Sequence, residues 1–236
     1  MTALRIASYN IRKALGTDRK RDPQRVLRVI KDLQADVVLL QEADYRLGPR
    51  PPVLPRDMIQ EVTGLTAVEF DHGRSSFGWL GNALLIRPEV ELIEANFADL
   101  PGLEPRGYIE AQLAHHGQQF RVVGVHLGLL RTSRRTQLTA LNQRLHLPQP
   151  ANLNLPTFIA GDFNERSLTV GLGRLARHFT IHSAGPTYHS RFPVFSLDRI
   201  AATHDVKPKL LKAHRSREAA LASDHLPLIG EFTLSR

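Results

Sequence analysis

The residues that most directly decide the fold are Ile159-Ala160-Gly161-Asp162-Phe163-Asn164-Glu165, an apolar run that ends in a glycine and then presents an acid and an amide. With Leu155-Pro156-Thr157-Phe158 before it, this run predicts a buried strand that carries polar groups at its carboxyl end. Side chains alternate along an extended chain, so Asp162 and Asn164 should face one way while Phe163 enters the core. We therefore expect Asp162 to take part in chemistry at an open sheet edge.

The same arrangement, an apolar strand followed by a polar tip, occurs twice near the start of the chain. Residues 4–10 alternate as a strand and end in Asn10, and residues 36–42 form a continuous apolar run that ends in Glu42. Between the two strands, Asp22-Pro23 predicts the N-cap and first residue of a helix. The apolar face of this amphipathic helix would consist of Val26, Leu27, Val29, Ile30 and Leu33.

The rest of the chain predicts more strands than one short sheet can hold. The proline-rich residues 48–56 indicate a loop, and helices are expected over residues 58–62, 132–146 and 168–178. Further strands are expected over residues 66–70, 82–87, 90–97, 107–114, 120–126, 196–202, 206–213 and 226–234. This mixture predicts an α/β fold in which two sheets pack face to face with helices outside.

Composition indicates an ordinary globular protein. The 236 residues are 42% hydrophobic and 23% charged, and no composition shift or linker divides them, so we expect a single catalytic domain over residues 1–236. The absence of cysteine excludes disulfides and thiolate metal sites and fits a reducing compartment. No export signal or long apolar run is visible, so we expect a cytoplasmic monomer without a transmembrane segment.

The charge of the chain favours polyanionic partners. A formal net charge of +8 suits nucleic acid, phosphorylated metabolites or an anionic lipid surface. Basic residues concentrate at Arg12-Lys13 with Arg19-Lys20-Arg21, at Arg131 with Arg134-Arg135, and between Lys207 and Arg217. Each cluster could equally be a solvated surface, and its importance depends on whether it borders a site.

Polar side chains at strand ends form a larger candidate set, namely Asn10, Glu42, His126, Asp162, Asn164, Asp198 and Asp224-His225. Each one alone has an ordinary explanation as a turn residue, a loop residue or an interior histidine. Taken together, acid and amide oxygens suit Mg²⁺ or Mn²⁺ better than Zn²⁺, and the basic surface suits phosphate esters. A weaker candidate for metal binding is the expected hairpin tip at His115-His116-Gly117.

Seven blocks of this sequence resemble the endonuclease/exonuclease/phosphatase superfamily, which includes DNase I-like nucleases, apurinic endonucleases, sphingomyelinases and inositol polyphosphate phosphatases. They occur in the family's order from residue 8 to residue 227. The matching blocks are Ser8-Tyr9-Asn10-Ile11, Leu40-Gln41-Glu42, Gly81-Asn82-Ala83-Leu84-Leu85, Val125-His126-Leu127, Gly161-Asp162-Phe163-Asn164, Leu197-Asp198-Arg199-Ile200 and Ser223-Asp224-His225-Leu226-Pro227.

The resemblance implies a four-layer α/β sandwich, with two packed central β-sheets flanked by helices and a site at one rim of the sheets. It implies that Glu42 is the principal ligand of a divalent cation, Mg²⁺ or Mn²⁺, with Asn10 and Asp224 nearby. It also implies that Asp162 positions or deprotonates the attacking water, while Asn164 polarises the phosphate.

The resemblance further implies that His225 contacts the phosphate and is oriented by Asp198, a pairing that would favour the protonated imidazole. His126 occupies the position of another phosphate-contacting residue. The implied reaction is in-line attack of water on phosphorus. Arg106 and Arg134 are candidate substrate-binding residues, because a guanidinium matches phosphate oxygens, although each could be an ordinary surface arginine.

The substrate follows less directly, because the shared residues hydrolyse many phosphate esters. The positive charge favours a nuclease, and a phospholipid or inositol-phosphate phosphodiesterase or phosphatase is the alternative. Ser196-Leu197 stands where inositol polyphosphate phosphatases have Trp-Cys before the acid, which weakens that assignment. A binding module without catalytic turnover is the non-enzymatic alternative.

Overall fold

The computed structural model describes residues 2–45, 48–70, 73, 75–145, 155–167 and 170–234. These residues form two mixed six-stranded sheets. In the first sheet the order is β11 (Pro208–Ala213), β12 (Leu228–Leu234), β1 (Thr2–Asn10), β2 (Val37–Gln41), β4 (Ala83–Ile86) and β3 (Thr66–Ala67). In the second it is β5 (Val90–Leu100), β6 (Arg106–His115), β7 (Gln118–His126), β8 (Thr157–Asp162), β10 (Asp198–Thr203) and β9 (Phe179–His182).

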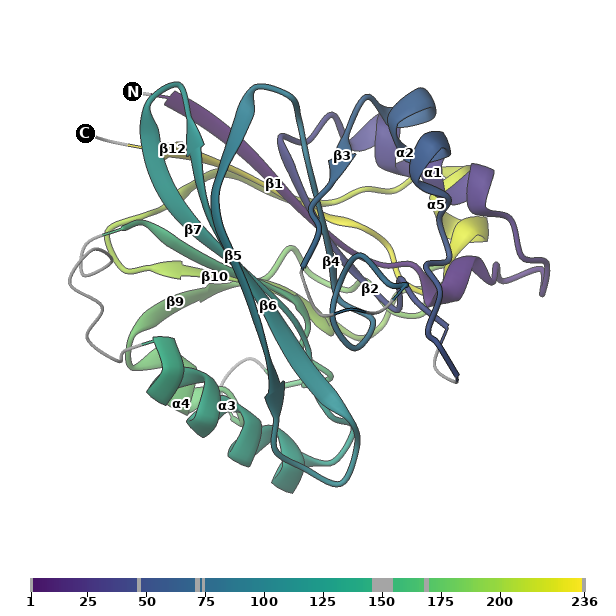
Figure 1. The fold of residues 1–236 in the computed structure, drawn as a ribbon. Helices are drawn as coiled ribbons and strands as arrows, with labels where there is room; N and C mark the ends of the chain where they lie inside the picture. Colours follow the sequence, from purple (N-terminus) through teal and green to yellow (C-terminus); the bar gives the residue numbers. More distant parts are fainter. Residues whose placement is uncertain are drawn as a thin grey trace.

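Helices cover the outer face of each sheet, which gives the expected α/β sandwich (Figure 1). On the first sheet lie α1 (Pro23–Leu33), α2 (Arg56–Thr63) and α5 (Arg217–Ala222). On the second lie α3 (Arg131–Leu145) and α4 (Gly173–Ala176). A separate core fills each of the three spaces between the four layers.

The alternation of side chains along β2 shows how one strand serves two cores. Val38 and Leu40 pack among the helices on the outer face, whereas Val37 and Leu39 pack between the two sheets. The whole strand is buried, as its continuous apolar sequence predicts. The strand therefore holds the chain that follows it, starting at Glu42, in a fixed position at the sheet edge.

Helix α1 confirms the predicted start and apolar face. The side chain of Asp22 accepts a hydrogen bond from the backbone N–H of Arg25, and Pro23 occupies the first turn. The helix ends at Gln34, which is in the left-handed conformation. The five predicted apolar residues are all buried, namely Val26, Leu27, Val29, Ile30 and Leu33.

Three local predictions differ from the structure. The helix expected over residues 168–178 is limited to α4, because Gly171 has a φ of +98° and cannot continue a helix; residues 168 and 169 lie outside the described residues. The strand expected over residues 66–70 forms only β3. Strand β9 and helix α5 were not predicted, and α5 buries only the small side chains of Ala219 and Ala222, which give a weak amphipathic signal.

The two ends of the described chain lie in neighbouring strands. Strand β1 pairs in parallel with β2 and antiparallel with β12, so Thr2 lies opposite Leu234. This places the carboxyl ends of β1 and β2 at the same edge of the first sheet. Within the described residues, no helix has the length and apolar character that a membrane crossing would require.

Candidate active site

The register of the second sheet brings three predicted site residues side by side. Strand β7 runs parallel to β8, so His126 lies beside Asp162 at the carboxyl ends of both strands. Strand β10 runs antiparallel to β8 and begins at Asp198, which is the partner of Asp162 on its other side. Strand register alone therefore gathers a histidine and two acids at one sheet edge.

The first sheet supplies the opposite wall of the site. Asn10 ends β1, Glu42 follows β2, and Asp224-His225 precede β12. Between these walls lies a cavity of about 580 Å³. Nine of the ten predicted site residues line it: Asn10, Glu42, Arg106, His126, Arg134, Asp162, Asn164, Asp224 and His225.

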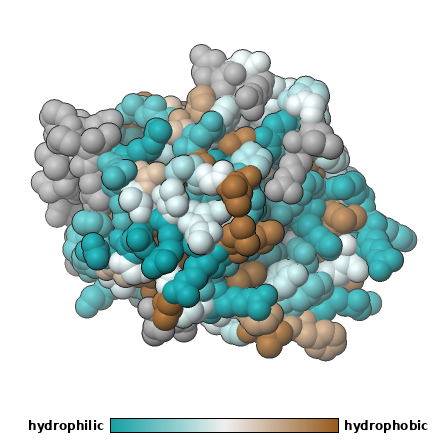
Figure 2. Space-filling view, turned by 90° about the horizontal axis from the view of Figure 1, so that it is seen from below, coloured by the Kyte–Doolittle hydropathy of each residue, from teal (hydrophilic) through white to brown (hydrophobic). Residues whose placement is uncertain are grey.

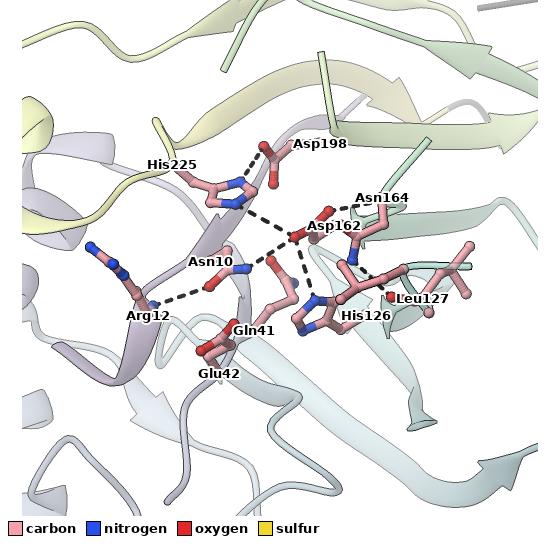
Figure 3. Close-up of polar contacts among 12 residues, drawn as sticks. Asn10, Arg12, Gln41, Glu42, His126, Leu127, Asp162, Asn164, Asp198 and His225 are labelled. Carbon is pink, nitrogen blue, oxygen red and sulfur yellow. Dashed lines mark hydrogen bonds and ion pairs between the residues drawn. The ribbon is translucent and has the colours of Figure 1, made fainter. Parts of the chain in front are cut away.

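Asp162 is the centre of the polar contacts in this cavity (Figure 3). Its Oδ2 accepts a hydrogen bond from Asn10 Nδ2 at 3.0 Å, and its Oδ1 accepts one from the backbone N–H of Asn164 at 2.9 Å. The Nε2 atoms of His126 and His225 lie 3.5 Å and 3.6 Å from Oδ2. The carboxylate is therefore fixed by groups from both sheets.

Local packing explains why glycine precedes Asp162. A Cβ atom at Gly161 would lie 1.8 Å from the carbonyl oxygen of Val125 in β7, which leaves no space for a side chain. Phe163 is fully buried, whereas Asp162 and Asn164 line the cavity, as the alternation predicted. The side chain of Asn164 also donates to the carbonyl of Leu127 at 2.9 Å, which fastens this turn to the end of β7.

His225 is held as a cation by the acids around it. Its Nδ1 lies 2.9 Å from Asp198 Oδ2, which also accepts a hydrogen bond from the hydroxyl of Thr187. Burial by itself would lower the pKa of His225, but Asp198 and Asp162 outweigh it and raise the pKa to about 10. Asp198 is fully buried behind the imidazole and does not line the cavity.

His126 has the opposite character. Burial lowers the pKa of its imidazole to about 3, and the attraction of Asp162 offsets only part of this effect. At neutral pH the cavity therefore contains one charged and one neutral imidazole on either side of the same carboxylate. The neutral ring of His126 offers a hydrogen bond without adding charge.

The two acids on the first-sheet side each contact a cation from the turn after β1. Lys13 Nζ pairs with Glu42 Oε2, and Arg12 Nε lies 3.2 Å from Asp224 Oδ2. Glu42, Asp224 and the amide of Asn10 present only oxygen ligands, which fits a hard divalent cation. Among the residues that the structure describes, no group of three or more His, Cys, Asp or Glu side chains is placed so that it could hold a metal ion.

The two predicted substrate arginines line the cavity, but other groups already engage both of them. Arg106 is buried, and its Nε and Nη2 donate to Glu104 at 3.2 Å and 3.0 Å. Arg134 donates to the carbonyls of Gly128 and Leu129 and pairs with Glu165 at 2.9 Å. Arg134 therefore supports the loops of the cavity wall.

Comparison with known proteins assigns the chain to a family. The sequence model of the Endonuclease/Exonuclease/phosphatase family matches residues 7–225, which include all ten predicted site residues. The chain belongs to this family. The search of curated proteins returned no match.

Several solved structures share the fold of this chain. An endonuclease/exonuclease/phosphatase from Bacteroides vulgatus has a TM-score of 0.75 at 20% identity, with 100% of both chains covered. The mannosyl-6-phosphatase of Bacteroides thetaiotaomicron has a TM-score of 0.75 at 17% identity, covering 98% of this chain and 100% of its own. D. rerio TDP2 complexed with a single-strand DNA product has a TM-score of 0.70 at 19% identity, covering 99% and 100%. The likeness extends over the fold, and family membership makes a phosphoesterase the supported activity class.

Several residues that line the cavity were not predicted from the sequence of this family member. Lys13, Arg50, Arg166 and Tyr188 line the cavity, and Thr187 holds Asp198 from behind. Only Lys13 gave a signal, as part of a basic cluster. The His115-His116-Gly117 segment forms the tip between β6 and β7, as predicted, and within the described residues it belongs to no group of three metal ligands.

Proposed function

We propose that this protein is a divalent-metal-dependent phosphodiesterase that hydrolyses its substrate by in-line attack of water. The observation that carries the proposal is the position of Asp162, whose carboxylate faces a cavity of about 580 Å³ between a protonated and a neutral imidazole. A carboxylate in this position can orient a water molecule and accept its proton. No covalent intermediate on the protein is needed.

The surrounding side chains have complementary roles in this proposal. The protonated imidazole of His225 donates a hydrogen bond to a non-bridging phosphate oxygen, and Asp198 keeps the ring charged and oriented. His126 and Asn164 provide further polar contacts for the phosphate, and Arg106 adds positive charge beside it. Arg134 lines the same cavity and is the second proposed substrate-binding arginine, and it also supports the loop before α3.

Glu42 is the proposed principal ligand of a Mg²⁺ or Mn²⁺ ion, with Asn10 and Asp224 nearby. When bound, the ion would supply positive charge to the phosphate oxygens. Lys13 and Arg12 neutralise Glu42 and Asp224 in the structure described here. These ion pairs offset the negative charges of the two acids, so the protein can fold without a metal ion bound there.

Nucleic acid is the substrate class that the net charge of +8 favours, which makes a nuclease the first candidate. Phospholipid is a second candidate, because apolar side chains are exposed on the loops around the cavity. A monomer of one catalytic domain that acts in the cytoplasm remains the prediction from sequence.

A substrate panel tests this proposal. Purified protein is incubated with Mg²⁺ or Mn²⁺ and with single-stranded, duplex and abasic DNA, RNA, phospholipid vesicles and inositol phosphates. We expect metal-dependent release of product from at least one phosphodiester, and chelation should abolish it. A chain that turns over none of these substrates, yet binds one of them with metal present, would instead be the binding module.

A further inference from the structure

Exposed apolar side chains gather on the loops that surround the cavity. Among the described residues, the five most exposed large hydrophobic side chains are Leu103 (84%), Phe192 (82%), Val194 (70%), Leu129 (67%) and Leu130 (50%). They lie on three connections: β5 to β6, β7 to α3, and the segment that precedes β10. Monomeric proteins rarely expose apolar side chains together unless a partner covers them.

These three loops also build the cavity wall. Leu129 itself lines the cavity, and Pro105 and Arg106 continue the loop of Leu103. Tyr188 and Leu197, on either side of the Phe192 loop, line it too. The first two loops touch, because Glu104 accepts a hydrogen bond from the backbone N–H of Leu129 at 2.9 Å.

Figure 2 views the molecule from the side on which the β5–β6 connection and the start of α3 lie in Figure 1. Apolar side chains form a broken band across this otherwise largely hydrophilic face. We call the loops bearing Leu103, Leu129-Leu130 and Phe192–Val194 the apolar rim. The rim borders the cavity rather than a remote part of the surface.

Arginines accompany the apolar rim. Exposed Arg131 directly follows Leu130, and exposed Arg191 directly precedes Phe192. Arg166 lines the cavity, with its guanidinium 4.1 Å from the centre of the Phe195 ring. Apolar side chains flanked by arginine are the combination that binds an anionic bilayer, since the first enter the acyl boundary and the second meet the phosphates.

The chemistry of the rim favours lipid over nucleic acid. Single-stranded nucleic acid binds by stacking its bases on aromatic rings, but Phe192 is the only aromatic residue among the five rim side chains. Leucine and valine offer no ring for a base, whereas they bury well among acyl chains. A second copy of this chain is a less suitable occupant, because it would bring further exposed arginines to the contact, whereas an anionic bilayer offers phosphates to them.

We propose that the apolar rim docks this protein on an anionic lipid bilayer, so that the cavity opens toward the phosphates of the lipid headgroups. Docking is independent of catalysis. Hydrolysis of a headgroup phosphate ester by the docked protein rests, in addition, on the proposed function.

Vesicle binding of a catalytically disabled protein tests the docking. The Asp162→Asn variant is mixed with a chelator and with vesicles of phosphatidylcholine containing phosphatidylglycerol, and the bound fraction is measured by flotation. Adding Leu129→Ser, Phe192→Ser and Val194→Ser should weaken binding about tenfold or more. The matched control, Leu92→Ser with Ile93→Ser, changes side chains that are 40% and 43% exposed on β5 and should leave binding unchanged.

The charge contribution has its own variant. Arg131→Gln with Arg191→Gln should weaken binding to the anionic vesicles and leave the small binding to pure phosphatidylcholine vesicles unchanged.

Equal binding by the rim variant and the parent protein would overturn the docking. So would a rim variant that keeps vesicle binding but loses affinity for single-stranded DNA, or a parent protein that is dimeric and becomes monomeric in the rim variant. Vesicle binding without lipid hydrolysis by the wild type would support docking and count only against a lipid headgroup as the substrate, whereas the proposed function itself fails if no phosphodiester of the substrate panel is hydrolysed.

Discussion

The charge on His225 can be tested by removing the acid behind it. Asp198→Asn keeps the shape of the side chain but removes the negative charge 2.9 Å from His225 Nδ1. Burial opposes protonation of this imidazole, so the attraction of the acids must more than offset burial to raise the pKa of His225 to about 10. Without Asp198, we expect the pKa of His225 to fall to roughly 7. This change corresponds to a loss of about 4 kcal/mol in the free energy that favours the protonated imidazole.

The pH dependence of hydrolysis reports this change. If the protonated imidazole is required, wild-type activity should persist to about pH 10, whereas the Asp198→Asn variant should already lose activity as the pH passes roughly 7. At pH 8.5 the variant should be roughly thirtyfold slower than the wild type, because only a few per cent of its imidazole stays protonated. The pH–rate profile is measured with a phosphodiester substrate, and an NMR titration of His225 follows the same group directly.

The unfolding free energy of the protein should also depend on the protonation of His225. A raised pKa means that the pair stabilises the wild type fully below about pH 6.5, and this stabilisation is lost as the pH rises through about 10. Asp205→Asn is the matched control, because Asp205 is exposed just beyond the other end of β10. If the Asp198→Asn variant lost activity at the same alkaline pH as the wild type, and if the NMR titration of its His225 were unchanged, the assignment of His225 as the cation would be refuted.

Three further predictions follow from the site. Glu42→Gln should raise the metal concentration for half-maximal activity about tenfold or more, and calorimetric titration of Mn²⁺ should show the same weakening. Because the pKa of His126 is lowered to about 3, the wild type should lose on the order of 2–4 kcal/mol of unfolding free energy as the pH falls from 6.5 to 3. Urea denaturation at several pH values should show that the unfolding free energy of His126→Gln falls less steeply over this range. Gly161→Ala should cost about 1–3 kcal/mol in thermal or urea denaturation, because its Cβ would meet the carbonyl oxygen of Val125 at 1.8 Å.

Each of these predictions has a control. Glu61→Gln changes an exposed acid on α2 and should leave the metal requirement unchanged. His204→Gln changes an exposed histidine and should show the same fall of unfolding free energy between about pH 6.5 and 3 as the wild type. Gly117→Ala has no atom within 4 Å of its added Cβ, although its φ of +76° adds backbone strain, so it isolates strain from the clash at Gly161. Equal effects in a variant and its control would contradict the corresponding explanation.

Much of the site could be predicted because it lies at strand ends. Asn10, Glu42, His126 and Asp162 each follow an apolar run, and the parallel pairing of β1 with β2 and of β7 with β8 brings them to two facing edges. Strand register then determines which side chains meet, as the neighbours His126 and Asp162 show. Register does not state what each side chain does, and the roles proposed here come from the resemblance of the ordered motifs to the family.

Other features depended on packing that no local pattern encodes. Lys13 reaches Glu42 because the turn after β1 carries three consecutive residues with positive φ, from Arg12 to Ala14. Arg134, a predicted substrate-binding residue, lines the cavity as expected, but its ion pair with Glu165, 31 residues further along the chain, was not predicted. The apolar rim was equally invisible, because a sequence does not state which of its hydrophobic residues stay exposed.

Asp162→Asn tests the central claim most directly. Replacing this carboxylate removes the proposed proton acceptor while keeping a side chain that can contact Asn10 and Asn164. The measurement is kcat for a phosphodiester at saturating metal, with metal affinity and unfolding free energy determined on the same samples. We predict that kcat falls by about 10²- to 10⁴-fold while the other two quantities stay near their wild-type values. Near-normal turnover by the Asp162→Asn variant would contradict the proposed water-activating role.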